Sequence, residues 1–310
     1  MKYLVTGGAG FIGSHLCDRL LKKGEVVCLD NFDQYYSPQA KQKNIEPLIR
    51  HPDFKLIRGN ILDLELLSSL FADVDYVFHN AAQAGVRASV DNPFKTHEVN
   101  ATGTLNVLEA AVDSGVRKLI NASSSSVYGK VSYLPFDENH PNVPISPYGA
   151  SKLVAEHYCR VFSELHGLET VSLRYFTVFG PKMRPDLAIN IFTRKALNNE
   201  PIEIFGNGGK TRDFTFIDNI INANLLAEER GSGEYNIGGG ERISINELAE
   251  RIVEIVGSES EIIHSEAVKG DAEHTWSDVS KAHRDIGYVP EIGLDQGLQR
   301  YVEWYIETNT

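Results

Sequence analysis

The sequence predicts an α/β fold, in which a doubly wound parallel sheet is joined to a smaller α/β cap. In the first half of the 310 residues, short apolar runs alternate with helical patterns, and this alternation is typical of parallel sheets. A glycine-rich segment separates the first run from the first helical pattern. After about residue 175 the pattern becomes irregular, with proline and glycine punctuation, and we expect this part to cover the sheet.

The individual elements are predicted from the spacing of apolar residues. The strand candidates are 3–6, 26–30, 56–57, 76–79, 118–122 and 170–173. Leu105, Leu108 and Val112 fall at helical spacing, as do Val154, Tyr158, Val161 and Leu165. A late helix begins at a capping box formed by Ser244 and Glu247. We assign 1–173 to the sheet domain, expect segments near 212–238 to rejoin it, and assign 174–310 mainly to the cap.

Composition and charge exclude several classes of protein. The net charge of −12 at pH 7 argues against nucleic acid or an anionic membrane as the main partner. No apolar run approaches the length of a membrane span, and the N-terminus enters a strand directly, without a signal peptide. The cysteines Cys17, Cys28 and Cys159 have no metal-type spacing, so we expect no metal site. A cytoplasmic location is the expectation.

The glycine-rich segment predicts a dinucleotide site. After the first strand comes a GxxGxxG run, followed by an amphipathic helix; its residues are Gly7, Gly10, Phe11, Ile12 and Gly13. Glycines allow a sharp turn and a close approach to a pyrophosphate, which the helix N-terminus stabilises. Asp30 ends the second strand, where a carboxylate bonds both ribose hydroxyls and repels a 2′-phosphate. The predicted cofactor is therefore NAD rather than NADP.

Further cofactor contacts are expected where the following strands end. They are Asn31, Asn60, Ile61, Ala81 and Ala82. Asn60 is placed to meet the adenine, and His79 is interpreted as a structural residue. Asn100 begins a helical pattern, and two interpretations stay open for it: a helix N-cap, or a polar group buried near the nicotinamide.

Tyr148 and Lys152 are the candidate catalytic pair. Four residues apart, they share one face of a helix. A free tyrosine has a pKa of about 10, and a nearby ammonium together with the positive nicotinamide ring favours its phenolate. Such a group can take a proton from a sugar hydroxyl while hydride leaves the same carbon. The plain alternative is a helix with Tyr148 packed and Lys152 solvated. Four serines, 123–126, follow a strand and supply further hydroxyls.

Six motifs resemble the extended short-chain dehydrogenase/reductases, and among them the UDP-sugar 4-epimerases. They are GGAGFIG, HNAA, SSSSVYG, YGASK, RYFTVFGP and RDFTFID, in this order over most of the chain. The resemblance implies a Rossmann domain with tightly held NAD, which Tyr148, Lys152 and Tyr175 also contact, and a UDP-sugar-binding cap. It implies oxidation at C4, rotation of the 4-keto sugar, and return of the hydride to the other face. It also implies a homodimer formed through helices near 100–114 and 148–166.

Within this resemblance, the serines separate related reactions. Ser124 matches the Ser/Thr that hydrogen-bonds the reacting C4 oxygen. Related 4,6-dehydratases carry Asp and Glu at the positions of Ser125 and Ser126, and related UDP-glucuronate decarboxylases carry Glu at the second. A hydroxyl cannot replace a carboxylate acid or base, which disfavours a dehydratase or decarboxylase. A non-catalytic NAD-binding scaffold is a further alternative, but it is expected to have lost part of the Tyr, Lys and Ser set. An aspartate is commoner than Asn60 in the family.

The resemblance also indicates the groups that hold the UDP moiety. Arg212 matches an arginine that contacts the diphosphate, with an ion pair to Asp213 as the alternative. Asn190 is expected near the nucleotide or the sugar. A second family arginine precedes the Gly-Asp that ends at Asp271; here its contact is missing or comes from Lys269 or Arg87.

For the sugar, the lean is to UDP-glucuronate and UDP-galacturonate. Ser125, Ser126 and Thr177 are placed to donate hydrogen bonds to a C6 carboxylate, and Arg184 to anchor them, unless Arg184 only pairs with Asp186. Thr275 matches the position whose bulk limits the C2 substituent, and its small size admits an N-acetyl group. UDP-glucose/UDP-galactose and UDP-GlcNAc/UDP-GalNAc therefore remain alternatives.

Overall fold

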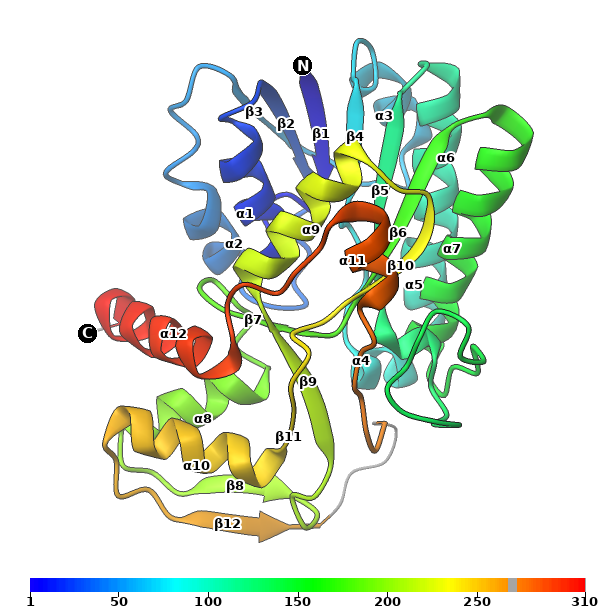
Figure 1. Cartoon of the computed structure of the whole chain (residues 1–310). Helices are drawn as coiled ribbons and strands as arrows, with labels where there is room; N and C mark the ends of the chain where they lie inside the picture. The colour runs from blue at the N-terminus through cyan, green and yellow to red at the C-terminus, as the bar shows by residue number, and fades with distance from the viewer. Residues whose placement is uncertain (267–271, 310) are drawn as a thin grey trace.

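A seven-stranded parallel sheet forms the centre of the computed structural model, which describes residues 1–266 and 272–309 (Figure 1). The strand order is β10-β6-β5-β4-β1-β2-β3. These strands are β1 (Lys2–Thr6), β2 (Glu25–Asp30), β3 (Phe54–Arg58), β4 (Tyr76–His79), β5 (Lys118–Ser124), β6 (Glu169–Tyr175) and β10 (Gly233–Ile237). The predicted α/β fold with a doubly wound parallel sheet is confirmed.

Both faces of this sheet are covered by helices. Along β1, Tyr3 and Val5 pack into one apolar core and Leu4 into another, as alternation along a strand requires. Two groups of helices supply the other sides of these cores. α1 (Phe11–Leu20), α2 (Pro38–Ile45) and α9 (Ile217–Glu229) form one group, and α3 (Leu64–Leu70), α6 (Gly103–Asp113) and α7 (Pro147–His166) form the other.

A smaller α/β unit lies at the carboxyl ends of the large sheet (Figure 1). It contains one three-stranded and one two-stranded sheet, in the orders β11-β9-β7 and β12-β8. The strands are β7 (Thr177–Phe179), β8 (Ile202–Phe205), β9 (Thr211–Phe216), β11 (Arg242–Ser244) and β12 (Ile262–Ser265). The helices α8 (Ala188–Leu197), α10 (Ile245–Val256) and α12 (Leu294–Asn309) pack around them. The capping box of Ser244 and Glu247 is present at the start of α10.

The chain returns from this unit to the large sheet late in the sequence. After β9, α9 packs on α1 and β10 pairs in parallel with β6. The helix α11 (Ser280–Ile286) then packs against β10. Within residues 1–266 and 272–309, no helix has the length and apolar character needed to cross a membrane.

Candidate functional site

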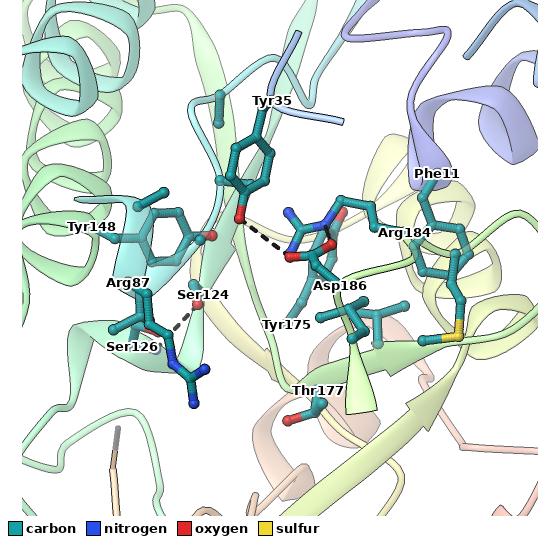
Figure 2. Close-up of a pocket in the computed structure, with 18 of the residues that line it drawn as sticks. Phe11, Tyr35, Arg87, Ser124, Ser126, Tyr148, Tyr175, Thr177, Arg184 and Asp186 are labelled. Carbon is teal, nitrogen blue, oxygen red and sulfur yellow. Dashed lines mark hydrogen bonds and ion pairs between the residues drawn. The ribbon is translucent and has the colours of Figure 1, made fainter. Parts of the chain in front are cut away.

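A cavity of about 1050 Å³ opens between the carboxyl ends of the large sheet and the smaller unit. In parallel sheets this edge is where ligands bind, because strand ends and helix N-termini meet there. The wall combines residues from the loops after β1, β2, β4 and β5 with residues from β7, α8, β8 and β9. Figure 2 shows part of this wall, with side chains of both regions directed toward the same space.

The glycine loop forms the wall after β1. Gly7 has a φ of +67°, and a Cβ built there lies 2.8 Å from the Ala81 nitrogen. A Cβ on Gly13 lies 2.2 Å from the Gly7 carbonyl oxygen, so no side chain fits without moving the loop. α1 begins directly after Gly10 without a side-chain cap, which leaves backbone N–H groups of its first turn for an anion.

Polar groups beside this loop fit a dinucleotide. The buried Asp30 carboxylate accepts hydrogen bonds from Ala9 N at 3.0 Å and from Phe32 N at 2.8 Å. The buried Tyr36 hydroxyl lines the cavity near Gly10 and meets no hydrogen-bond partner within the described ranges. An orphaned buried hydroxyl is costly, and a ligand oxygen at this place satisfies it. The residues present therefore fit a phosphate-bearing cofactor.

Several other predicted cofactor residues also line the cavity. They are Phe11, Ile12, Asn31, Asn60, Ile61, Ala81, Ala82 and Tyr175. The Tyr175 hydroxyl donates to Asn224 Oδ1 at 3.0 Å, which fixes the ring against the cavity. The Asn60 side chain accepts from Leu62 N at 3.1 Å, so it shapes the turn after β3.

Ser124, Tyr148 and Lys152 come together on one side of the cavity. Ser124 ends β5, and its hydroxyl accepts a hydrogen bond from Ser126 N at 3.2 Å. Tyr148 and Lys152 lie in the first two turns of α7 (Figure 2 shows Tyr148). The Lys152 ammonium is buried and donates to the Ala122 carbonyl at 2.8 Å. The alternative of a solvated lysine is therefore wrong.

Burial is the largest influence on the electrostatics of this group. Burial raises the pKa of Tyr148, while a hydrogen bond with Ser124 and the positive charge of Arg184 act in the opposite direction. Burial lowers the pKa of Lys152 to about 8. The Lys152 ammonium is directed to the Ala122 carbonyl, and its effect on the phenol together with the nicotinamide ring stays a prediction.

Asn100 lies behind the cavity rather than in its wall. It belongs to a π-helical turn, Glu98–Thr102, and its side chain bonds Gln83 N at 2.7 Å, Gln83 O at 3.1 Å and Ser151 Oγ at 2.9 Å. The N-cap interpretation is wrong, because Asn100 is inside a continuous helical segment. Its bonds instead tie the loop after β4 to α7. His79 is fully enclosed and lies between Thr6 Oγ1 at 2.7 Å and Thr104 Oγ1 at 3.0 Å.

The predicted UDP-sugar residues occupy the remaining wall of the cavity. Arg87, Ser125, Ser126, Thr177, Arg184, Arg212 and Thr275 all line it. The Arg212 guanidinium donates to the Thr211 carbonyl at 2.8 Å. Asp213 accepts hydrogen bonds from Gly239 N at 2.8 Å and from Ser277 N at 3.0 Å, so the structure gives no support to the alternative ion pair.

Arg184 combines both interpretations that the sequence left open. It lines the cavity, and it also pairs with Asp186 through contacts of 3.2 Å and 3.3 Å (Figure 2).

Asn190 was predicted to contact the nucleotide or the sugar, but its side chain does not reach the cavity. Its buried amide donates to the Tyr301 hydroxyl at 2.8 Å, and it is not part of the cavity wall. The spacing of α8 directs this face of the helix toward α12. Lys269 and Asp271 lie outside the described residues.

Four of the wall residues that were not predicted bear on ligand binding. Tyr35, Tyr36 and Lys41 come from the segment after β2, and Phe205 comes from the end of β8. The consecutive aromatics after the Asp30 strand end were a usable signal, since aromatic side chains in a polar loop commonly contact a ligand. Nothing local marked Phe205, whose place depends on how the smaller unit covers the sheet.

Relatives with known names match this chain over nearly its whole length. A UDP-glucuronate 4-epimerase of Thermodesulfobacterium geofontis is 40% identical over 308 residues, which cover 97% of this chain and 95% of the relative. A putative UDP-glucose 4-epimerase of Methanocaldococcus jannaschii is 39% identical over 312 residues, which cover 99% of each. The solved UDP-glucuronic acid 4-epimerase from Bacillus cereus, in complex with UDP-glucuronic acid and NAD, has a TM-score of 0.94 and 38% identity; the match covers 99% of this chain and 100% of that chain.

The fold and the site define a class: α/β proteins with a dinucleotide loop and a Tyr, Lys and Ser group at one sheet edge. A model of the NAD dependent epimerase/dehydratase family matches residues 3–238. The chain belongs to this NAD dependent epimerase/dehydratase family. The resemblance inferred from the six motifs is thereby confirmed, and so is NAD as the predicted cofactor.

Proposed function

We propose that the protein is an NAD-dependent UDP-sugar 4-epimerase whose preferred pair is UDP-glucuronate and UDP-galacturonate. The observation that carries the proposal is the composition of one wall of the cavity. Ser124, Tyr148 and Lys152 adjoin Ser125 and Ser126, which are hydroxyls where a dehydratase needs carboxylates. The matches to UDP-glucuronate and UDP-glucose 4-epimerases support the same reaction.

The residues that hold the cofactor are those of the glycine loop and the strand ends. The N-terminus of α1 would hold its pyrophosphate, Asp30 would accept hydrogen bonds from its ribose, and the Tyr36 hydroxyl would bond one of its oxygens. When bound, NAD supplies reversible hydride acceptance at C4 of the sugar.

Tyr148 is the proton acceptor and donor in this proposal. It removes the proton of the C4 hydroxyl during oxidation and returns it when the other face is reduced. Ser124 hydrogen-bonds the same oxygen. Its hydrogen bond with Tyr148 favours the phenolate and so opposes the rise in the pKa that burial causes. The hydrogen bond from Lys152 to the Ala122 carbonyl fixes the ammonium one helical turn from Tyr148.

The preference for a uronate rests on the donors around the sugar. Ser125, Ser126 and Thr177 offer hydroxyls to a C6 carboxylate, and Arg184 offers a planar pair of donors. A 4-keto uronate is a β-keto acid, which loses CO₂ unless its carboxylate is held out of alignment with the ketone. Ordered hydroxyl donors provide that restraint without supplying an acid or base.

The UDP moiety is assigned to the part of the cavity that Arg87, Arg212 and Phe205 line. Arg212 and Arg87 face the diphosphate, and the half-exposed Phe205 ring offers a stacking surface for the base. The Arg87 guanidinium lies 5.4 Å from the centre of the Phe205 ring, within cation–π range, so the two line the same part of the cavity wall. Lys269 and Asp271 stay predictions.

UDP-GlcNAc and UDP-GalNAc are the second candidate pair. The observation that favours them is Thr275, a small buried side chain in the wall of the cavity. A side chain of this size leaves room for an N-acetyl group at C2.

Separate incubation with UDP-glucuronate, UDP-glucose and UDP-GlcNAc tests the proposal. The expected result is formation of the C4 epimer, resolved by NMR, with the highest kcat/KM for UDP-glucuronate. A 4-keto-6-deoxy sugar indicates a dehydratase, and release of CO₂ as the main product indicates a decarboxylase. Retention of NAD without turnover of any sugar indicates a non-catalytic scaffold.

We also propose a cytoplasmic homodimer. All three cysteines are unpaired and buried, as expected in a reducing compartment. Phe94 on α5 (Pro93–His97) and Leu165 on α7 are strongly exposed, and these helices pack against each other. The family resemblance places a second copy of the chain on the helices near 100–114 and 148–166, and Leu165 belongs to the second of these, with Phe94 on the adjoining α5.

A further inference from the structure

The loop of residues 180–187, between β7 and α8, is anchored at its base to the large-sheet unit. The His15 ring nitrogen Nε2 lies 2.9 Å from the Pro181 carbonyl, and Lys182 Nζ donates to the Asn44 carbonyl at 2.9 Å. These contacts fix where the loop begins. They place its following residues, Arg184 and Asp186, at the cavity.

At the tip of the loop, Arg184, the residue proposed to bind the substrate carboxylate, already forms an ion pair. Arg184 Nε lies 3.2 Å from Asp186 Oδ1, and Arg184 Nη2 lies 3.3 Å from Asp186 Oδ2. The Tyr35 hydroxyl donates to the same Oδ2 at 3.2 Å, and the guanidinium lies 5.3 Å from the centre of the Tyr35 ring. In the view of Figure 2, this group lies between Tyr148 and Phe11.

The two members of the pair differ in exposure. The Arg184 side chain is 17% exposed and the Asp186 side chain is 43% exposed. Asp186 can therefore return to water, where its lost bonds to Arg184 and to the Tyr35 hydroxyl are replaced by bonds to solvent, whereas Arg184 keeps its contact with the Tyr35 ring. Partly exposed pairs of this kind contribute only about 0.2–1 kcal/mol, so a ligand carboxylate of the same geometry competes with Asp186.

We propose that Asp186 is a specificity-determining residue that exchanges with the substrate carboxylate on Arg184. With a neutral sugar, Asp186 neutralises Arg184 and no uncompensated charge faces the C6 hydroxymethyl group. With a uronate, the C6 carboxylate takes the two guanidinium donors and Asp186 turns to solvent. Asp186 thus lowers the affinity for uronates and lets one site accept both classes of sugar. This inference rests on the proposed UDP-sugar epimerase function.

The Asp186→Asn variant tests the exchange. Binding of UDP-glucuronate and UDP-glucose to the NAD-loaded protein is measured by calorimetry, together with KM and kcat for each. We expect UDP-glucuronate to bind about twofold to fivefold more tightly, the range of an exposed ion pair, and UDP-glucose to change less. Asp295→Asn is the matched control, since Asp295 also pairs with an arginine, Arg251, but lies outside the cavity wall.

A double-variant cycle tests whether Asp186 changes the affinity for UDP-glucuronate through Arg184. In an Arg184→Ala background, Asp186→Asn is expected to change neither affinity, because its partner is gone. Weaker UDP-glucuronate binding by Asp186→Asn, or equal change for both sugars, overturns the exchange and makes Asp186 a positioning residue for Arg184. If the wild type epimerises no sugar, the proposed function fails. The change in affinity caused by Asp186→Asn, measured for UDP-glucuronate and for UDP-glucose, still decides whether the exchange occurs.

Discussion

Tyr148 needs neighbouring groups to favour its phenolate, because burial raises its pKa. Burial disfavours the phenolate, and Ser124 and Arg184 partly offset the effect. Removing the hydroxyl by Tyr148→Phe leaves the ring packing but no proton acceptor. Epimerisation is expected to fall about 10²- to 10⁴-fold, the usual share of general acid–base catalysis.

The control for that variant is Tyr133→Phe. Tyr133 lies outside the cavity wall, and its exposed hydroxyl donates to Asp137. Product formation by chromatography is the measurement, with NAD content and thermal unfolding as checks on folding. Turnover of Tyr148→Phe near the wild-type rate would contradict the assigned role.

At the scale of single residues, sequence reasoning identified residues at the cavity from two kinds of signal. Ser124 and Asp30 follow from a polar residue type at a strand end, Tyr148 follows from its spacing to Lys152 on one helix, and all three line the cavity. Asn190 does not line the cavity. The sequence around an asparagine on a helix does not show which way its side chain points, and here its amide donates to Tyr301 from a helix far along the chain. The Arg184–Asp186 pair was considered from the sequence. The hydrogen bond from Tyr35 to Asp186 was not, because these two residues are 151 positions apart and only the fold brings them together.

The glycine loop and α1 act as one element, and Gly13 sets their distance. A Cβ at position 13 lies 2.2 Å from the Gly7 carbonyl oxygen, which is backbone and cannot rotate away. We expect Gly13→Ala to displace the loop, to lower the free energy of unfolding by about 1–3 kcal/mol, and to give protein without NAD. Gly293→Ala is the control, since nothing lies within 4 Å of its built Cβ. Absorbance of cofactor released from the purified variants is the measurement; normal NAD content in Gly13→Ala would contradict this account.

His79, on the central strand β4, bonds the Thr6 hydroxyl of β1 and the Thr104 hydroxyl of α6. Burial, with a smaller contribution from Lys152, lowers its pKa to about 3. Between that value and the unfolded value of about 6.5, the unfolded chain binds a proton that the folded chain does not, so stability falls as pH falls. From pH 7 to pH 5 this costs about 2 kcal/mol.

His79→Gln, which keeps a donor and an acceptor, is expected to lose that part of the pH dependence. Urea unfolding at pH 5 and pH 7 measures it, and the other histidines cancel in the comparison with wild type. Equal pH dependence in the two proteins would show that His79 does not resist protonation.

Strands and helices were more predictable than the turns between them. The strands β1, β2 and β4 differ from the predicted ranges by at most one residue at either end, because two-sided burial requires continuous apolar runs. The capping box at Ser244 was predictable from two residues alone. The π-helical turn at Glu98–Thr102 was not, since its extra residue is accommodated by the bonds that Asn100 makes to Gln83 and Ser151.

At the scale of the whole molecule, the exposed apolar side chains on α5 and α7 require an explanation. Phe94 is 86% exposed, Leu165 72% and Val161 39%, although large apolar side chains on adjoining helices are normally covered. We expect the wild type to be a dimer by light scattering after gel filtration, and Phe94→Asp or Leu165→Asp to yield monomers, because a carboxylate buried in an apolar interface has no partner. Val289→Asp, at a 47% exposed site away from these helices, is expected to leave the dimer intact. A monomeric wild type, or dimers in all three variants, would exclude this surface as the subunit interface.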